Sequence, residues 1–112
     1  NTIKVLVDVH SDAMLMTRRA VPTLAPGGLA DTPVFKQVCV IPFTADELRT
    51  YAALAPTPLE RTESIDMLRL MEHGRRVRMV ETDVDSHAVD TEADRVRVEA
   101  LLAADPLTET LR

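Results

Sequence analysis

The run from Thr57 to Gly74, TPLERTESIDMLRLMEHG, constrains the fold most, because its ends and its apolar spacing predict one amphipathic helix. Thr57 is a suitable N-cap, Pro58 suits the first helical position, and Glu60 completes a capping box. Gly74 is expected to end the helix. The rest of the chain is expected to form a scaffold around this helix.

Two acids, Glu60 and Glu63, fall on the apolar half of the predicted helix when each residue turns it by about 100°. That half also carries the leucines and methionines of the run: Leu59, Met67, Leu68, Leu70 and Met71. A carboxylate that faces a core is costly unless it is paired, hydrogen-bonded or bound to a ligand. For Glu60 the capping box is the favoured role, and a ligand role is the alternative. Glu63 has no such role and is the better candidate for a binding site.

Composition restricts the class of protein. The 112 residues suit one small domain or part of a larger one, and 46% apolar but only 3% aromatic residues predict an aliphatic, methionine-based core. A net charge of −5 with mixed signs leaves no basic stripe, which argues against a nucleic-acid partner. No apolar run reaches membrane-spanning length, so no membrane partner is expected. The single cysteine, Cys39, excludes an internal disulfide and fits a reducing cytoplasm.

The remaining patterns predict an α/β fold with a mixed sheet. Apolar or alternating runs predict strands at residues 2–9, 13–17, 34–43 and 76–82, the first two as a hairpin. Capping patterns predict further helices from Thr44 to before Pro56 and over residues 91–104. Prolines and glycines predict a long loop at 20–33, and residues 105–112 are expected to be a fraying tail.

Several polar side chains are placed where predicted elements end, which is a common place for ligands in α/β folds. Arg18 and Arg19 follow the second strand and either clamp a carboxylate or phosphate or lie in solvent. Asp90, before the last helix, is either a helix cap or a ligand of a hard cation. His87 is interpreted as an exposed loop histidine, and Gln37 as a hydrogen-bonded amide of the core.

Four segments resemble, in the same order, the C-terminal half of the cytidylyltransferases that activate 3-deoxy-manno-octulosonate (Kdo), the CMP-Kdo synthetases. NTIKVLVD is similar to that family's N-x-VKVV-D strand, MTRRAVP to its F-S-R-A-x-I-P segment, and AVDTEADRVRVEAL to its G-V-D-T-P-E-D-L-E-R-V segment. The most specific match is PTPLERTESIDMLRLMEHG, which resembles S-P-L-E-x-x-E-x-L-E-Q-L-R-x-L-x-x-G. The resemblance extends over residues 1–104.

This resemblance implies part of a transferase that moves CMP from CTP to an acidic sugar, with Mg²⁺ and with release of pyrophosphate, in lipopolysaccharide biosynthesis. It places Asp90 at the family's magnesium-binding aspartate, which makes Asp90 the catalytic and metal-binding candidate. It places Arg18 at a sugar-binding arginine and Asp66 at a sugar-contacting glutamate. Gln37 and Glu63 complete the set of substrate-binding candidates.

The resemblance also implies a Rossmann-like nucleotidyltransferase fold whose N-terminal nucleotide-binding half is missing from this sequence, so these residues alone are expected to be inactive. Residues 1–104 are expected to be the acceptor-binding and dimerisation part of a homodimer, with residues 105–112 as a tail. The loop at 20–33 is a candidate arm toward the partner subunit.

Departures from the family pattern leave the acceptor open. Met67 stands in place of a family glutamine, and Gln37 and Ile41 stand in place of a histidine and a tyrosine. The acceptor is therefore Kdo, another sugar acid or a phosphonate. A non-catalytic module for oligomerisation or ligand sensing is the alternative function.

Overall fold

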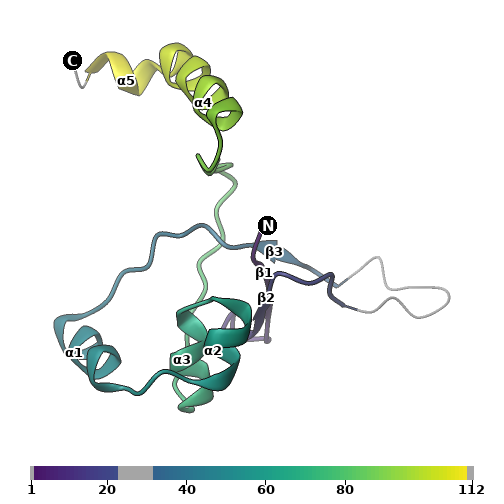
Figure 1. The fold of residues 1–112 in the computed structure, drawn as a ribbon, viewed down its shortest axis with the longest axis vertical. Helices are drawn as coiled ribbons and strands as arrows, with labels where there is room; N and C mark the ends of the chain where they lie inside the picture. Colours follow the sequence, from purple (N-terminus) through teal and green to yellow (C-terminus); the bar gives the residue numbers. More distant parts are fainter. Residues whose placement is uncertain (1, 23–31, 111–112) are drawn as a thin grey trace, which may run out of the picture. The chain divides into compact units, whose positions relative to one another are not determined.

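A computed structural model describes residues 2–22 and 32–110 (Figure 1). The strands are β1 (Lys4–Val7), β2 (Ala13–Thr17) and β3 (Phe35–Lys36). The helices are α1 (Ala45–Ala53), α2 (Pro58–Glu63), α3 (Met67–Glu72), α4 (Glu92–Ala104) and α5 (Pro106–Thr110). The chain divides into two compact units, Asn1–Glu81 and Thr82–Arg112.

Strand β1 is the middle strand of an antiparallel sheet with the order β2-β1-β3. The predicted hairpin of β1 and β2 is confirmed, with Val5 opposite Met16 and Leu6 opposite Leu15. Val5 of β1 and Met16 of β2 are fully buried. The α/β prediction is confirmed. The strand pairs among the described residues are all antiparallel, so the mixed character of the predicted sheet is not seen in this part.

The core of the first unit lies between this sheet and the helices α2 and α3. Its buried hydrophobic residues are Val5, Met16, Ile65, Met67, Leu68 and Leu70. The core is aliphatic and methionine-based, as the composition predicts. Burying each such side chain contributes about 1.5–3 kcal/mol relative to leaving it exposed, so the α2–α3 region anchors the unit.

The prediction of one continuous helix from Thr57 to Gly74 is wrong, because the run forms the two short helices α2 and α3. Ser64 adopts a left-handed conformation with φ of 53° and ends α2, and the Ile65 N–H donates to the Glu60 carbonyl at 3.3 Å. A non-glycine residue in this conformation costs about 1–2 kcal/mol. The break places the Ile65 side chain in the core, only 3% exposed, and its burial contributes about 1.5–3 kcal/mol. Core packing therefore offsets the strain at the break.

The strand predicted at 34–43 is much shorter in the structure, where it covers only β3. Only β3 pairs with β1, and the Gln37 N–H adds one further bond to the Ile3 carbonyl at 2.9 Å. Beyond this point Val40 is 79% exposed, and no strand among the described residues pairs with the stretch. Apolar composition favours a strand, but the strand forms only where a partner backbone lies beside it.

The strand predicted at 76–82 is reduced to an isolated antiparallel bridge between Asp12 and Arg78. The Ala13 N–H donates to the Val77 carbonyl at 2.9 Å beside this bridge. The buried Asp12 carboxylate accepts from Arg78 Nε at 2.6 Å, which ties the hairpin turn to this segment. The segment is thus attached to the sheet without extending it.

Both capping-box predictions outside the central run place a helix start correctly. Thr44 Oγ1 accepts the Glu47 N–H at 3.2 Å and opens α1. Thr91 and Asp94 form a complete capping box at the start of α4. Short-range side-chain acceptors satisfy the first N–H groups of a helix, which explains why these starts are predictable from local sequence.

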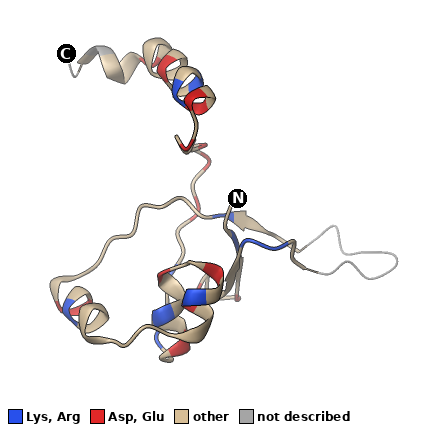
Figure 2. Cartoon of the chain, in the orientation of Figure 1, with Lys and Arg blue, Asp and Glu red and all other residues tan. Residues whose placement is uncertain are grey.

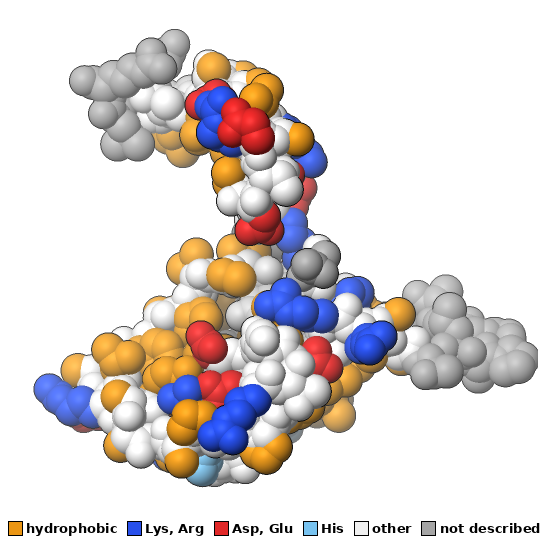
Figure 3. All heavy atoms as spheres, in the orientation of Figure 1, with side chains coloured by type: hydrophobic (Ala, Val, Ile, Leu, Met, Phe, Trp, Pro, Cys, Tyr) orange, Lys and Arg blue, Asp and Glu red, His pale blue; other side chains and the backbone are white. Residues whose placement is uncertain are grey.

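The second unit contains α4, which carries both acidic and basic residues (Figure 2). Arg95 pairs with Glu92 and with Glu99 on the same helix. The apolar residues of α4 are not buried within this unit: Val96 and Leu101 are both about half exposed, and hydrophobic side chains reach the surface of the helix (Figure 3). The predicted tail at 105–112 contains the short helix α5, so that prediction is wrong for residues 106–110.

The predicted loop at 20–33 lies mostly at residues 23–31, outside the described residues. None of the helices in the described ranges is long and apolar enough to cross a membrane.

Candidate functional site

The end of strand β2 meets the break between α2 and α3, and hydrogen bonds join them. The Glu63 carboxylate accepts from Thr17 Oγ1 at 2.9 Å and from the Arg18 N–H at 3.0 Å. The Arg18 guanidinium donates to the carbonyls of Glu63 at 3.1 Å and Ser64 at 3.2 Å. The structure therefore brings together Arg18 and Glu63, two of the predicted substrate-binding residues.

These contacts explain why an acid stands on the apolar half of the predicted helix. The Arg18 N–H and the Thr17 hydroxyl lower the pKa of the Glu63 carboxyl below its usual value, against the opposing effect of desolvation. Thr17 is buried, and its Oγ1 also accepts the Arg19 N–H at 3.1 Å. Thr17 was not identified from the sequence, because a threonine at a strand end is common and nothing local marks a partner 46 positions away.

Asp66 lies beside this corner, at the N-cap position of α3. Its side chain is exposed, and its carbonyl accepts the Arg69 N–H at 3.1 Å. Met67, the next residue, is buried in the core. The methionine that replaces a family glutamine thus occupies an apolar position, whereas the acid before it is open to solvent.

Gln37, the fourth predicted substrate-binding residue of this unit, directly follows β3 and is only 9% exposed. Its Oε1 has no hydrogen-bond partner among the described residues. The interpretation as a buried amide is confirmed, but the amide is not fully hydrogen-bonded within this part of the chain. An unsatisfied buried acceptor costs about 1–3 kcal/mol, so Gln37 is a position where an outside donor would be stabilising.

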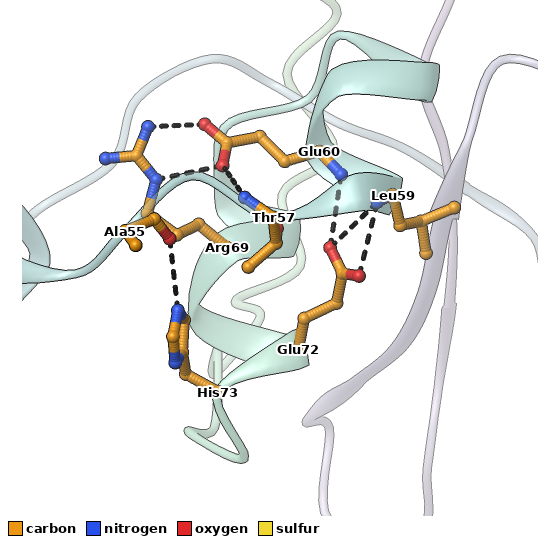
Figure 4. A network of polar contacts seen from close by, with 7 residues as sticks. All are labelled: Ala55, Thr57, Leu59, Glu60, Arg69, Glu72 and His73. Carbon is orange, nitrogen blue, oxygen red and sulfur yellow. Dashed lines mark hydrogen bonds and ion pairs between the residues drawn. The ribbon is translucent and has the colours of Figure 1, made fainter.

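Glu60, the other acid of the apolar half, has a structural role. Its carboxylate accepts from Arg69 Nε at 2.9 Å, from Arg69 Nη2 at 2.5 Å and from the Thr57 N–H at 3.0 Å (Figure 4). The bonds from Arg69, more than the Thr57 N–H, lower the pKa of Glu60 to about 2. The predicted capping role of Glu60 is confirmed, and the ion pair with Arg69 adds to it.

A second carboxylate also serves the start of α2. Glu72, from the end of α3, accepts the Leu59 N–H at 3.1 and 3.2 Å and the Glu60 N–H at 3.2 Å (Figure 4). Beside it, His73 Nε2 lies 3.1 Å from the Ala55 carbonyl. The first N–H groups of α2 are thus satisfied from within the chain, and the start of α2 is not a candidate anion site.

Asp90 lies in the second unit, just before α4. Thr91 is the N-cap of that helix, so the helix-cap alternative for Asp90 is wrong. The Asp90 N–H donates to Asp94 Oδ2 at 3.3 Å, and the Asp90 side chain is exposed. His87, three residues earlier, is exposed as predicted, with Nε2 lying 3.7 Å from Asp85 Oδ2.

In residues 2–22 and 32–110, no three His, Cys, Asp or Glu side chains are grouped so that they could hold an ion. Mg²⁺ is usually held by one or two carboxylates together with water and substrate phosphates, and seldom by an all-protein cage. The exposed carboxylate of Asp90 fits the first of these modes.

Comparison with known proteins connects this arrangement to an enzyme family. No family model matches the chain. The 3-deoxy-manno-octulosonate cytidylyltransferase of Anaeromyxobacter sp. (strain Fw109-5) is 39% identical over 104 residues, which is 93% of this chain and 42% of that protein. The protein of the same name from Solibacter usitatus (strain Ellin6076) is 40% identical over 107 residues, 96% of this chain and 42% of that protein.

A solved structure gives the same result. The structure of CMP:2-keto-3-deoxy-manno-octonic acid synthetase complexed with CTP matches with a TM-score of 0.81 and 32% identity, over 92% of this chain and 42% of that one. The chain spans less than half the length of the relatives that it matches. Over nearly its whole length, the chain is similar to part of the 3-deoxy-manno-octulosonate cytidylyltransferases.

Proposed function

We propose that this chain is part of a cytidylyltransferase that transfers CMP from CTP to an acidic sugar of the Kdo type and releases pyrophosphate. The match to proteins of that name, 39% and 40% identical over 93% and 96% of the chain, carries the proposal. Because the chain spans 42% of those relatives, the activity is assigned to the full-length protein and not to these residues alone.

The acceptor is assigned to the corner where β2 meets the α2–α3 break. Arginine matches a carboxylate well because its planar guanidinium offers several parallel N–H donors. In this proposal Arg18 holds the acceptor carboxylate, and the exposed Asp66 carboxylate accepts hydrogen bonds from sugar hydroxyls. The buried Oε1 of Gln37 would accept one further hydrogen bond from the acceptor.

Asp90 would hold Mg²⁺, and the ion would offset negative charge on the reacting phosphate. The exposed position of the carboxylate supports this role, as does the capping of α4 by Thr91, which leaves Asp90 out of the cap.

The test is pyrophosphate release from CTP by the full-length protein with Mg²⁺, with Kdo, other sugar acids and a phosphonate as separate acceptors. We expect release with Kdo. Release only with a different acid would overturn the acceptor assignment, and no release with any acid would overturn the cytidylyltransferase itself. Asp90→Asn is expected to lower the rate about 100-fold or more, since a metal ion supplies several kcal/mol of charge stabilisation. The matched control is Asp83→Asn, an exposed acid upstream, which is expected to retain full activity.

We further propose that the full-length protein is a cytoplasmic homodimer. The mass of the particle in solution, measured by light scattering after size exclusion, tests the dimer: a particle of one chain would contradict it. A non-catalytic role is not needed to account for the match to the cytidylyltransferases.

A further inference from the structure

We infer that Glu63 is a positioning residue, and that it acts on the acceptor through Arg18 and Asp66 without touching it. It holds the end of β2 against the α2–α3 corner, and so determines where these two side chains lie. We call the hydrogen bonds by which Glu63 holds the end of β2 the brace. The effect of the brace on acceptor binding rests on the proposed function, whereas the brace itself does not.

The first observation is that both oxygens of the Glu63 carboxylate already have partners within the chain. Oε1 accepts from Thr17 Oγ1 at 2.9 Å, and Oε2 accepts from the Arg18 backbone N–H at 3.0 Å. The second of these bonds holds the main chain of Arg18. Glu63 therefore positions the backbone from which the Arg18 side chain extends.

The second observation is that the contact is reciprocal. The Arg18 guanidinium donates to the carbonyls of Glu63 and Ser64, at the C-terminal end of α2. The last carbonyls of a helix lack partners within the helix, so these bonds satisfy groups that would otherwise need water. The two segments, more than forty positions apart in the chain, thus hold each other from both sides.

The third observation is that the corner leads directly to Asp66. Ser64 has a φ of 53°, and Ile65 is anchored in the core. The Leu68 N–H then bonds the Ile65 carbonyl at 3.1 Å and begins the turn into α3. Asp66 directly follows Ile65 and lies three residues after Glu63, so a shift of Glu63 is expected to move the main chain that carries the Asp66 carboxylate.

The experiment uses acceptor kinetics of the full-length protein. Glu63→Ala is expected to raise the KM for the acceptor about 10- to 100-fold, because misplacement of binding groups by about 1 Å has effects of this size. The KM for CTP is expected to stay unchanged. Glu63→Gln is expected to restore most of the acceptor affinity, because its amide can accept from the Arg18 N–H and donate to Thr17 Oγ1.

A double-mutant cycle separates bracing from direct contact. Thr17 is buried, and Thr17→Val removes its hydroxyl bond to Glu63 together with the bond from the Arg19 N–H. We expect it to raise the acceptor KM less than Glu63→Ala does. Combining the two changes is expected to raise the acceptor KM by less than the product of the two single effects, since they share the Thr17–Glu63 bond. Multiplied effects, or a Glu63→Gln variant as impaired as Glu63→Ala, would show that Glu63 contacts the acceptor and would overturn the inference.

Glu47→Ala is the matched control. It removes another ion pair between two segments, Glu47 Oε1 to Arg75 Nη2 at 2.5 Å, at the first helix and not at the corner. The acceptor KM of this variant is expected to equal that of the wild type. A raised value would mean that any loosened ion pair produces the effect, which contradicts a specific brace.

Amide hydrogen exchange supplies a readout that does not depend on activity. In the full-length protein, Glu63→Ala is expected to speed exchange of the Arg18 amide about tenfold or more, and Glu63→Gln much less. Unchanged exchange in Glu63→Ala would overturn the brace. A wild-type protein that releases no pyrophosphate would overturn the proposed function, while the exchange result would still decide on the brace.

Discussion

Arg69 of α3 binds both carboxylate oxygens of Glu60 of α2, with Nε to Oε2 at 2.9 Å and Nη2 to Oε1 at 2.5 Å (Figure 4). The same guanidinium lies over the ring of Tyr51 from α1, with its central carbon 4.7 Å from the ring centroid. One arginine thus connects α1, α2 and α3. If residues 57–74 formed one continuous helix, Glu60 and Arg69 would lie on opposite sides of it. They meet because the helix breaks at Ser64 and the chain changes direction there.

Removing Arg69 is expected to destabilise the protein strongly, because Glu60 would remain buried without its cation. We expect Arg69→Ala to lower the melting temperature of the full-length protein by about 10 °C. Arg69→Lys is expected to be intermediate, since an ammonium group cannot reproduce the planar pair of bonds. Arg61→Ala, at an exposed position of α2, serves as the control and is expected to change the melting temperature little. A similar loss in Arg61→Ala and Arg69→Ala would disprove the role of the pair.

The pair also predicts how stability depends on pH. The pKa of Glu60 is about 2 in the folded protein, against an ordinary value of 4.5. Because the folded pKa is the lower one, the unfolded state takes up a proton first, and the contribution of Glu60 is complete above about pH 4.5 and lost as the pH falls toward 2. Denaturant unfolding at several pH values should show the difference in stability between wild type and Glu60→Gln shrinking over that range. A difference that stays constant from pH 5 to about pH 2 would contradict the lowered pKa.

Truncation of Leu68 tests the core. This side chain is fully buried between the sheet and the helices, so Leu68→Ala should reduce the free energy of unfolding by about 2–5 kcal/mol. Leu48→Ala on α1 removes the same atoms from a side chain that is 53% exposed, and is expected to cost much less. Chemical denaturation of both variants makes the comparison. Equal losses would mean that Leu68 is not packed as the structure shows.

The left-handed residue at the corner provides a test of the helix break. Ser64→Gly is expected to preserve stability or raise it slightly, because glycine adopts a φ of 53° without steric strain. Ser64→Val is expected to lower the free energy of unfolding by about 1–2 kcal/mol, since a branched side chain is strained there. Thermal melting measures both. A valine variant as stable as the glycine variant would indicate that α2 and α3 form one continuous helix.

Several features of the fold were predictable from short stretches of sequence. The helix starts at Thr44 and Thr91 depend on side chains that bond N–H groups a few positions later, and both are confirmed. The hairpin and the limits of β2 follow from two adjacent apolar runs. Gly74 has a φ of 73° and ends the helical run as predicted.

Extents of elements were predicted less well, because they depend on distant partners. The run at 34–43 has strong strand composition, yet only the β3 residues find a neighbouring strand in the described part of the chain. The break at Ser64 has no proline or glycine to announce it, and it is stabilised by the burial of Ile65. Pairing and burial join residues far apart in sequence, so local patterns cannot specify them.

In the candidate site, too, local sequence predicted some features and long-range packing determined the others. Residue type and helical spacing were enough to single out Glu63 as an acid that needed a partner and Arg18 as a cation at a strand end. Folding alone made them each other's partners, with the buried Thr17 as a third member, because hydrogen bonds across 45 and 46 positions exist only once the hairpin packs on the corner. Local chemistry thus specified the caps, turns and polar candidates of this chain. Long-range packing specified the helix break, the length of the strands and which polar groups meet.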